Sequence, residues 1–176
     1  MNNFFNYNNF FFDFDGTICN SSDGIITSLS KSINLVTGSN LEINSDIIGP
    51  PLKEMISGIL PNVKNDNLES ILKEFRKDYD LNGFKISELY PHFINILVRL
   101  KSEKKKIFIV TNKPSYVTNK ILILHEIDKY FFECVSVDKT NILKKSKSTI
   151  INRIIATQNL NVSESIFIGD TMDDLN

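Results

Sequence analysis

FFFDFDGT, from Phe10 to Thr17, is the strongest indicator of the fold in this sequence. Its three phenylalanines form an apolar run without alternation, which is typical of a strand covered on both faces in a parallel sheet. Two carboxylates, Asp13 and Asp15, follow this run, and Gly16 comes next. Because open α/β sheets carry their chemistry at the carboxyl ends of their strands, this position predicts an active site.

Two further apolar runs have the same form. Residues 107–110 end at Thr111 and Asn112, and residues 166–168 are followed closely by Asp170. A weaker strand is predicted at residues 134–137, and helical patterns cover residues 93–100, 114–124 and 147–158. Strands that alternate with helices in this way predict a parallel sheet of βα units.

Between the first two strands the apolar residues recur at helical spacing instead. The stripes cover residues 26–36, 52–59 and 68–79, and Gly38 is a suitable end for the first helix. No strand-like run of comparable strength lies in this region, so an all-helical insert is expected. The predicted organisation is an α/β core formed by residues 1–19 and 89–176, with a helical domain at residues 20–88.

Composition and charge exclude several classes of protein. The 176 residues carry a formal net charge of -1, and the basic runs at 104–106 and 144–147 are short, which predicts no nucleic-acid partner. No apolar stretch is long enough for a transmembrane helix, and the N-terminus lacks the pattern of a secretory signal. With only two cysteines, Cys19 and Cys134, a reduced cytoplasmic protein is expected.

The polar residues at the predicted strand ends suit phosphoryl transfer. The acidic ones are Asp13, Asp15, Asp170 and, four residues further on, Asp174. Clustered carboxylates repel one another unless a cation lies among them, and oxygen ligands beside phosphate favour Mg²⁺. The Thr111 hydroxyl, the Asn112 amide and a lysine near residue 145 can then bind phosphate oxygens.

Three motifs carry a resemblance to a known family. Asp13 to Thr17 resembles the first motif of the haloacid dehalogenase superfamily, and Ile107 to Thr111 is similar to its second. Ile166 to Asp170, together with Asp174, resembles its acidic fourth motif. Each motif alone has limited specificity, whereas three in order at fitting distances are a strong signal.

Shorter segments resemble the phosphoglycolate phosphatase-like branch of that family. These are Ile48 to Leu52, Tyr90-Pro91 and Thr111 to Pro114. The resemblance covers about residues 9 to 176 and implies a Rossmann-like parallel core with an all-helical cap at residues 20–88.

The resemblance also implies residue roles. Asp13 would be the nucleophile that forms an aspartyl-phosphate, and Asp15 would be the general acid and base. Thr111 would bind the phosphoryl group, with the Asn112 backbone beside it. The implied Mg²⁺ ligands are Asp13, the backbone carbonyl of Asp15, and Asp170, with Asp174 supporting the site.

The third motif of the resembled family contains a lysine, and three residues of this sequence are candidates for it. Lys147 is favoured because the lysine of the resembled family usually lies about three residues before the apolar stripe, which begins here at Ile150, and Lys144 and Lys145 are the alternatives. Lys53 lies at the start of a predicted cap helix, where it either contacts substrate or is a solvated helix residue.

The expected function is Mg²⁺-dependent hydrolysis of a small phosphorylated metabolite, such as phosphoglycolate or a sugar phosphate. The alternatives are a phosphomutase of the β-phosphoglucomutase type and a truncated, non-catalytic binding protein. The sequence stops two residues after Asp174, whereas members of the resembled family continue. The C-terminal end of the core is therefore expected to be missing, which would leave a sheet edge exposed to self-association.

Overall fold

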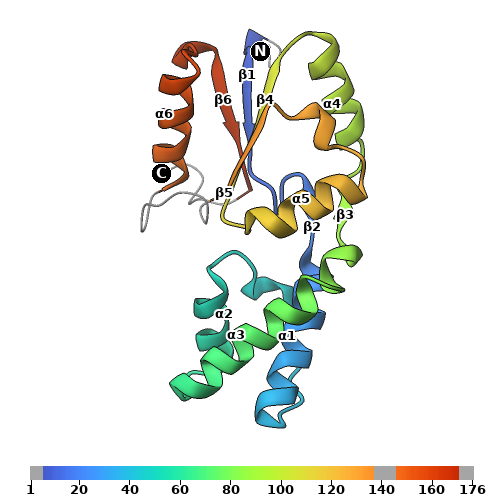
Figure 1. The fold of residues 1–176 in the computed structure, drawn as a ribbon, viewed down its shortest axis with the longest axis vertical. Coiled ribbons are helices and arrows are strands. Elements are labelled where there is room, and N and C mark those ends of the chain that lie inside the picture. Colours follow the sequence, from blue (N-terminus) through green and yellow to red (C-terminus); the bar gives the residue numbers. More distant parts are fainter. Residues whose placement is uncertain (1–5, 137–145, 171–176) are drawn as a thin grey trace. The chain divides into compact units, whose positions relative to one another are not determined.

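The structure, a computed structural model, describes residues 6–136 and 146–170 (Figure 1). Contacts between residues divide the chain into two compact units. One combines Met1–Cys19 with Leu89–Asn176, and the other is Asn20–Glu88.

A parallel sheet forms the centre of the first unit. Its described strands have the order β5 (Glu133–Ser136), β4 (Lys106–Thr111), β1 (Asn9–Phe12) and β6 (Ser165–Ile168). Every neighbouring pair is parallel. This confirms the predicted α/β core, although β5 begins one residue earlier than expected. Because the strands are parallel, all four carboxyl ends lie at one edge of the sheet.

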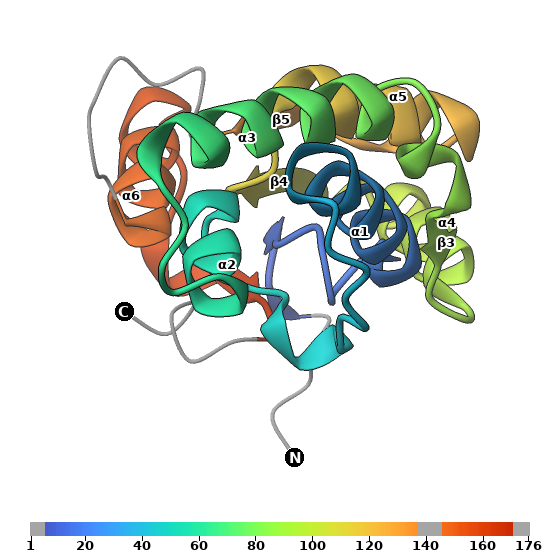
Figure 2. The ribbon, with the colours of Figure 1, turned by 90° about the horizontal axis from the view of Figure 1, so that it is seen from below.

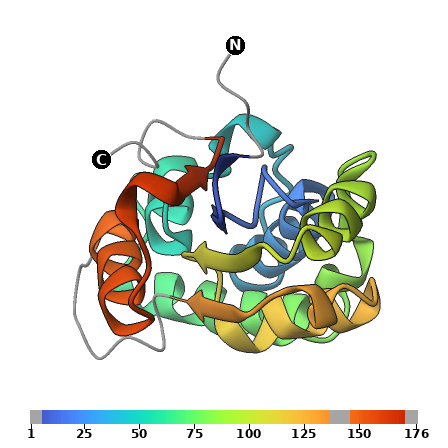
Figure 3. The same ribbon diagram turned by 90° about the horizontal axis from the view of Figure 1, so that it is seen from above.

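Helices cover both faces of this sheet. Figure 3 shows α4 (Phe93–Ser102) and α5 (Ser115–Leu124) on one face and α6 (Lys147–Thr157) on the other. The strand order explains this, because right-handed crossovers place helices on opposite faces when the chain reverses its direction across the sheet. Strand β1 lies between β4 and β6 and is covered on both sides, and its three phenylalanines are at most 3% exposed.

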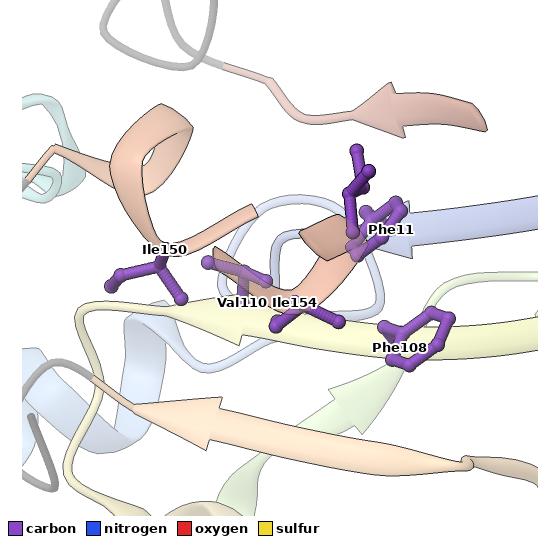
Figure 4. Close-up of a cluster of buried hydrophobic side chains, with 6 residues drawn as sticks. Phe11, Phe108, Val110, Ile150 and Ile154 are labelled. Carbon is purple, nitrogen blue, oxygen red and sulfur yellow. The ribbon is translucent and has the colours of Figure 1, made fainter. Parts of the chain in front are cut away.

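The packing beneath α6 holds that helix against the sheet. Side chains of β1 and β4 meet the apolar face of α6, as Figure 4 shows. The buried members of this cluster are Phe11, Phe108, Val110, Ile150, Ile154 and Ile155. The rings of Phe11 and Phe108 stack with their centroids 4.7 Å apart. On the opposite face, Phe12 meets Phe93 of α4 edge to face at 5.4 Å.

The second unit consists of helices. They are α1 (Ser22–Thr37), η2 (Ser45–Ile47), α2 (Leu52–Ile59), α3 (Asn65–Tyr79) and η3 (Gly83–Ile86). Helices α1 and α3 lie side by side (Figure 2). Gly24 lets α1 approach η3 closely, because a Cβ there would overlap the carbonyl oxygen of Gly83. As predicted, α1 ends at Gly38, whose φ of 72° is left-handed.

Two short strands lie at the boundaries between the units. These are β2 (Cys19–Asn20) and β3 (Glu88–Leu89), and they pair as a separate two-stranded sheet. Within residues 6–136 and 146–170, no helix has the length and apolar character needed to cross a membrane.

Candidate active site

A tight loop after β1 presents Asp13 and Asp15 at the carboxyl edge of the sheet. The Asp13 amide donates to the Ile168 carbonyl at 2.9 Å, which extends the pairing of β1 with β6 by one bond. The carbonyl of the fully buried Phe14 then accepts from the amides of Ile18 at 2.9 Å and Cys19 at 3.1 Å. These bonds anchor the loop that carries the two carboxylates.

Lys147 pairs with the predicted nucleophile. Its Nζ lies 2.8 Å from Oδ2 of Asp13, and the two side chains are only 10% and 8% exposed. Lys147 is the first residue of α6, and the Ser146 hydroxyl caps this helix by accepting from the Thr149 amide. The packing of α6 against β1 and β4 therefore places the ammonium group of Lys147 at the carboxyl ends of the strands. The alternatives Lys144 and Lys145 lie outside the described residues.

A second lysine pairs with the predicted acid–base residue. Nζ of Lys113 lies 2.9 Å from Oδ1 and 3.2 Å from Oδ2 of Asp15. The Lys113 side chain is 4% exposed and that of Asp15 is 29% exposed. Thr111, which is 1% exposed, shapes this turn because its hydroxyl accepts from the Lys113 amide at 3.1 Å.

Lys113 is a residue of this site that the sequence did not predict, because the Thr111 to Pro114 segment indicates no contact for its side chain. The usable signal was its position two residues after the end of β4, at the same sheet edge as Asp15.

Asp170 contacts the loop that carries the first two acids. It is exposed and follows β6. A Cβ added to Gly16, whose φ is +80°, would overlap the Asp170 carboxylate, so only glycine leaves room for it. The Thr17 hydroxyl also donates to Oδ1 of Asp170 at 3.4 Å. Asp174 lies outside the described residues.

The pKa of Tyr90 is raised by its surroundings at the carboxyl ends of the strands. Burial raises the pKa of its phenol, and the charges of Asp170, Cys19 and Asp15 raise it further. Its amide donates to the Ile18 carbonyl at 3.1 Å, which ties it to the loop after β1. The Tyr90-Pro91 segment does not by itself indicate this interaction, because Tyr90 comes near the acids only in the folded chain.

The described residues offer oxygen donors suited to Mg²⁺. The Asp170 carboxylate lies against Gly16, the residue that follows Asp15. Carboxylate and carbonyl oxygens are the donors that hard cations prefer. Among the residues that the structure describes, no group of three His, Cys, Asp or Glu side chains could hold a metal ion. Backbone carbonyl oxygens and water are further donors that such a site can use.

Two further predicted residues, Asn112 and Lys53, are exposed. Asn112 follows β4 and its side chain is exposed. Lys53 is an exposed residue of α2 in the Asn20–Glu88 unit. The structure thus brings Lys147 to Asp13, Lys113 to Asp15, and Asp170 to Gly16 and Thr17, which directly follow Asp15.

The fold and this set of residues match a known family. Residues 10–176 match the model of the haloacid dehalogenase-like hydrolases. The chain therefore belongs to the haloacid dehalogenase-like hydrolase family.

Relatives place the chain more closely within this family. It is 27% identical over 177 residues to a phosphoglycolate phosphatase from Aliivibrio fischeri, covering 93% of this chain and 76% of that protein. It is 25% identical over 173 residues to the pyrophosphatase PpaX of Anoxybacillus flavithermus, covering 97% and 78%. The chain is a phosphatase of the phosphoglycolate phosphatase-like branch.

A solved structure supports the fold independently. The crystal structure of a predicted phosphoglycolate phosphatase from Haemophilus somnus superposes with a TM-score of 0.83 at 22% identity. The match covers 98% of this chain and 80% of that one. Because the identity is low, this likeness bears on the arrangement of helices and strands alone.

Proposed function

We propose that this protein hydrolyses small phosphomonoesters, of the phosphoglycolate or sugar phosphate type, through an aspartyl-phosphate on Asp13. The observation that carries the proposal is the buried pair of Asp13 with Lys147 at 2.8 Å. An ammonium beside a carboxylate at the end of a parallel strand can hold a phosphate dianion next to its nucleophile. Similarity to a protein named as a phosphoglycolate phosphatase supports this substrate class.

The reaction has two balanced steps. In the first, a carboxylate oxygen of Asp13 attacks phosphorus, the ester P–O bond breaks, and Asp15 gives a proton to the leaving oxygen. In the second, water attacks the phosphorus of the aspartyl-phosphate and gives a proton to Asp15. The P–O bond to Asp13 breaks, which releases phosphate and restores the carboxylate.

Other residues of the core hold the phosphoryl group in this proposal. The Thr111 hydroxyl and the Asn112 backbone would donate to its oxygens, and Lys147 would neutralise its charge. Asp13, the Asp15 backbone carbonyl and Asp170 would hold Mg²⁺, with Asp174 supporting the site. When bound, Mg²⁺ supplies further positive charge against the phosphoryl oxygens.

The proposal also assigns a role to the helical unit and a cellular location to the protein. Residues 20–88 would act as a cap that excludes water and limits substrate size, with Lys53 contacting the substrate. The protein would work in the cytoplasm on small metabolites, without nucleic acid. Self-association through a sheet edge stays a prediction.

Substitution of the nucleophile tests the proposal. Asp13→Asn should lower the release of phosphate from p-nitrophenyl phosphate by roughly 1000-fold or more, because an amide is a poor nucleophile. Addition of EDTA to the unmodified protein should also stop release, and acid quenching should trap a phosphorylated protein. The matched control is Asp128→Asn in η4 (Asp128–Tyr130), which lies before the amino end of β5.

The same assays separate the alternatives. Near-normal turnover by Asp13→Asn would contradict the covalent route. Conversion of a sugar phosphate to its isomer, without phosphate release, would favour the mutase. Metabolite binding without any turnover by the unmodified protein would favour the non-catalytic binding protein.

A further inference from the structure

Two lysines serve the two catalytic carboxylates, and the proposed chemistry uses only one of them. Lys147 reaches Asp13 and accounts for the charge on the nucleophile and the transferred phosphoryl group. Lys113 reaches Asp15 instead, through contacts of 2.9 and 3.2 Å with its two oxygens. Its role in the reaction is therefore unassigned.

The side chain of Lys113 is buried at the site and does not extend into solvent. Its side chain is 4% exposed, whereas lysines usually keep their ammonium group in water. Removing an ammonium from water is costly unless an anion compensates it. In the structure, the carboxylate of Asp15 is one such anion.

The position of Lys113 puts its charge on the leaving-group side of the reaction. Asp15 is the proposed donor to the leaving oxygen, so that oxygen must come within hydrogen-bond reach of Asp15. Because Nζ of Lys113 bonds the same carboxylate, it would lie beside the leaving group. Lys147 lies on the nucleophile, so the two ammonium groups face different parts of a substrate.

We infer that Lys113 is a specificity-determining residue that binds a second anionic group of the substrate, close to the scissile oxygen. This inference rests on the proposed function. The group would be a carboxylate or a second phosphate, since both accept strong charge-assisted hydrogen bonds from an ammonium. Phosphomonoesters with an uncharged leaving group would lack this contact and react more slowly.

A pair of isosteric substrates tests the inference. Phosphoglycolate and phosphoglycolamide have nearly the same shape, but only the first carries the additional negative charge. The unmodified protein should favour phosphoglycolate by about 10- to 100-fold in kcat/KM, as expected for a hydrogen bond between charged groups. Binding of pyrophosphate and of methyl phosphate to Asp13→Asn reports whether a second phosphate is also favoured, because binding does not depend on how easily the leaving group departs.

Lys113→Met keeps the length of the side chain and removes its charge. It should reduce the preference for phosphoglycolate to within about threefold of unity, chiefly through a higher KM for that substrate. Lys113→Arg should retain most of the preference because it retains the charge. The control Lys129→Met removes an exposed lysine of η4 and should leave the preference unchanged.

The outcomes separate this inference from the proposed function. If Lys113→Met lowers kcat/KM equally for both substrates, Lys113 only positions Asp15 and the inference is wrong, while the hydrolase proposal stands. Calorimetric binding of both compounds to Asp13→Asn, with and without Lys113→Met, measures recognition without turnover. A preference that disappears with Lys113→Met supports the inference, whereas equal binding, or no binding of either compound, overturns it.

Discussion

Lys147→Met should destabilise the core because it leaves the Asp13 charge without its ammonium neighbour. The two charged atoms are 2.8 Å apart, and the side chains are 10% and 8% exposed. At an effective dielectric constant of about 20, Coulomb's law gives an attraction of about 6 kcal/mol at this distance. Desolvation of both groups offsets part of it, and breaking a buried pair costs about 3–5 kcal/mol.

A double-mutant cycle isolates this interaction. Lys147→Met should lower the free energy of unfolding by about 3 kcal/mol, and Asp13→Asn by a similar amount. The double variant should lose less than the sum of the two, with a coupling energy of about 2–3 kcal/mol. Urea unfolding at pH 7 in the presence of EDTA, followed by circular dichroism, measures all four proteins without bound metal.

One control and one threshold value make the cycle decisive. Lys129→Met, at an exposed lysine, should change the free energy of unfolding by less than about 0.5 kcal/mol. A coupling energy between Lys147 and Asp13 below about 0.5 kcal/mol is the value typical of solvent-exposed pairs. That result would refute the argument that this pair is buried and defines the nucleophile's environment.

Three further substitutions test the loop and the helical unit. Gly16→Ala should destabilise the protein by about 1–3 kcal/mol and reduce phosphate release, because it combines left-handed strain with displacement of Asp170. Gly38 has the same left-handed backbone but open space around it. Thermal unfolding of Gly38→Ala should therefore show the cost of backbone strain alone, and activity should persist. An equal loss of activity in Gly16→Ala and Gly38→Ala would contradict this reasoning. The Ser28 hydroxyl donates to Asp78 at 2.7 Å, and this hydrogen bond is the largest cause that lowers the pKa of Asp78. The ionised Asp78 therefore stabilises the fold at pH values above its unfolded pKa of about 3.9. Asp78→Asn should therefore cost about 1–3 kcal/mol at pH 7 in urea unfolding, and the loss should shrink as pH falls through the folded pKa; a constant difference down to pH 2 would count against it.

Lys113 illustrates why part of the site escaped sequence reasoning. Its partner Asp15 is 98 positions away, and their contact requires β4 to lie beside β1. A flexible lysine two residues after a strand is ordinarily a solvated side chain, and no local pattern distinguishes it from a buried one. Lys147 was easier to predict because it begins the helix whose apolar stripe the sequence displays.

The sequence by itself determined the four strands of the core sheet, the main helices and the acids at the strand ends; it did not predict the short strands β2 and β3. Apolar runs and helical periodicity are local signals, and Asp13 and Asp15 adjoin the first run directly. Only the tertiary structure decided which charges meet, because strand order and helix packing join residues that are far apart in the chain. The pairs of Asp13 with Lys147 and of Asp15 with Lys113 depend on that assembly, since an ammonium can be buried only where folding supplies an anion.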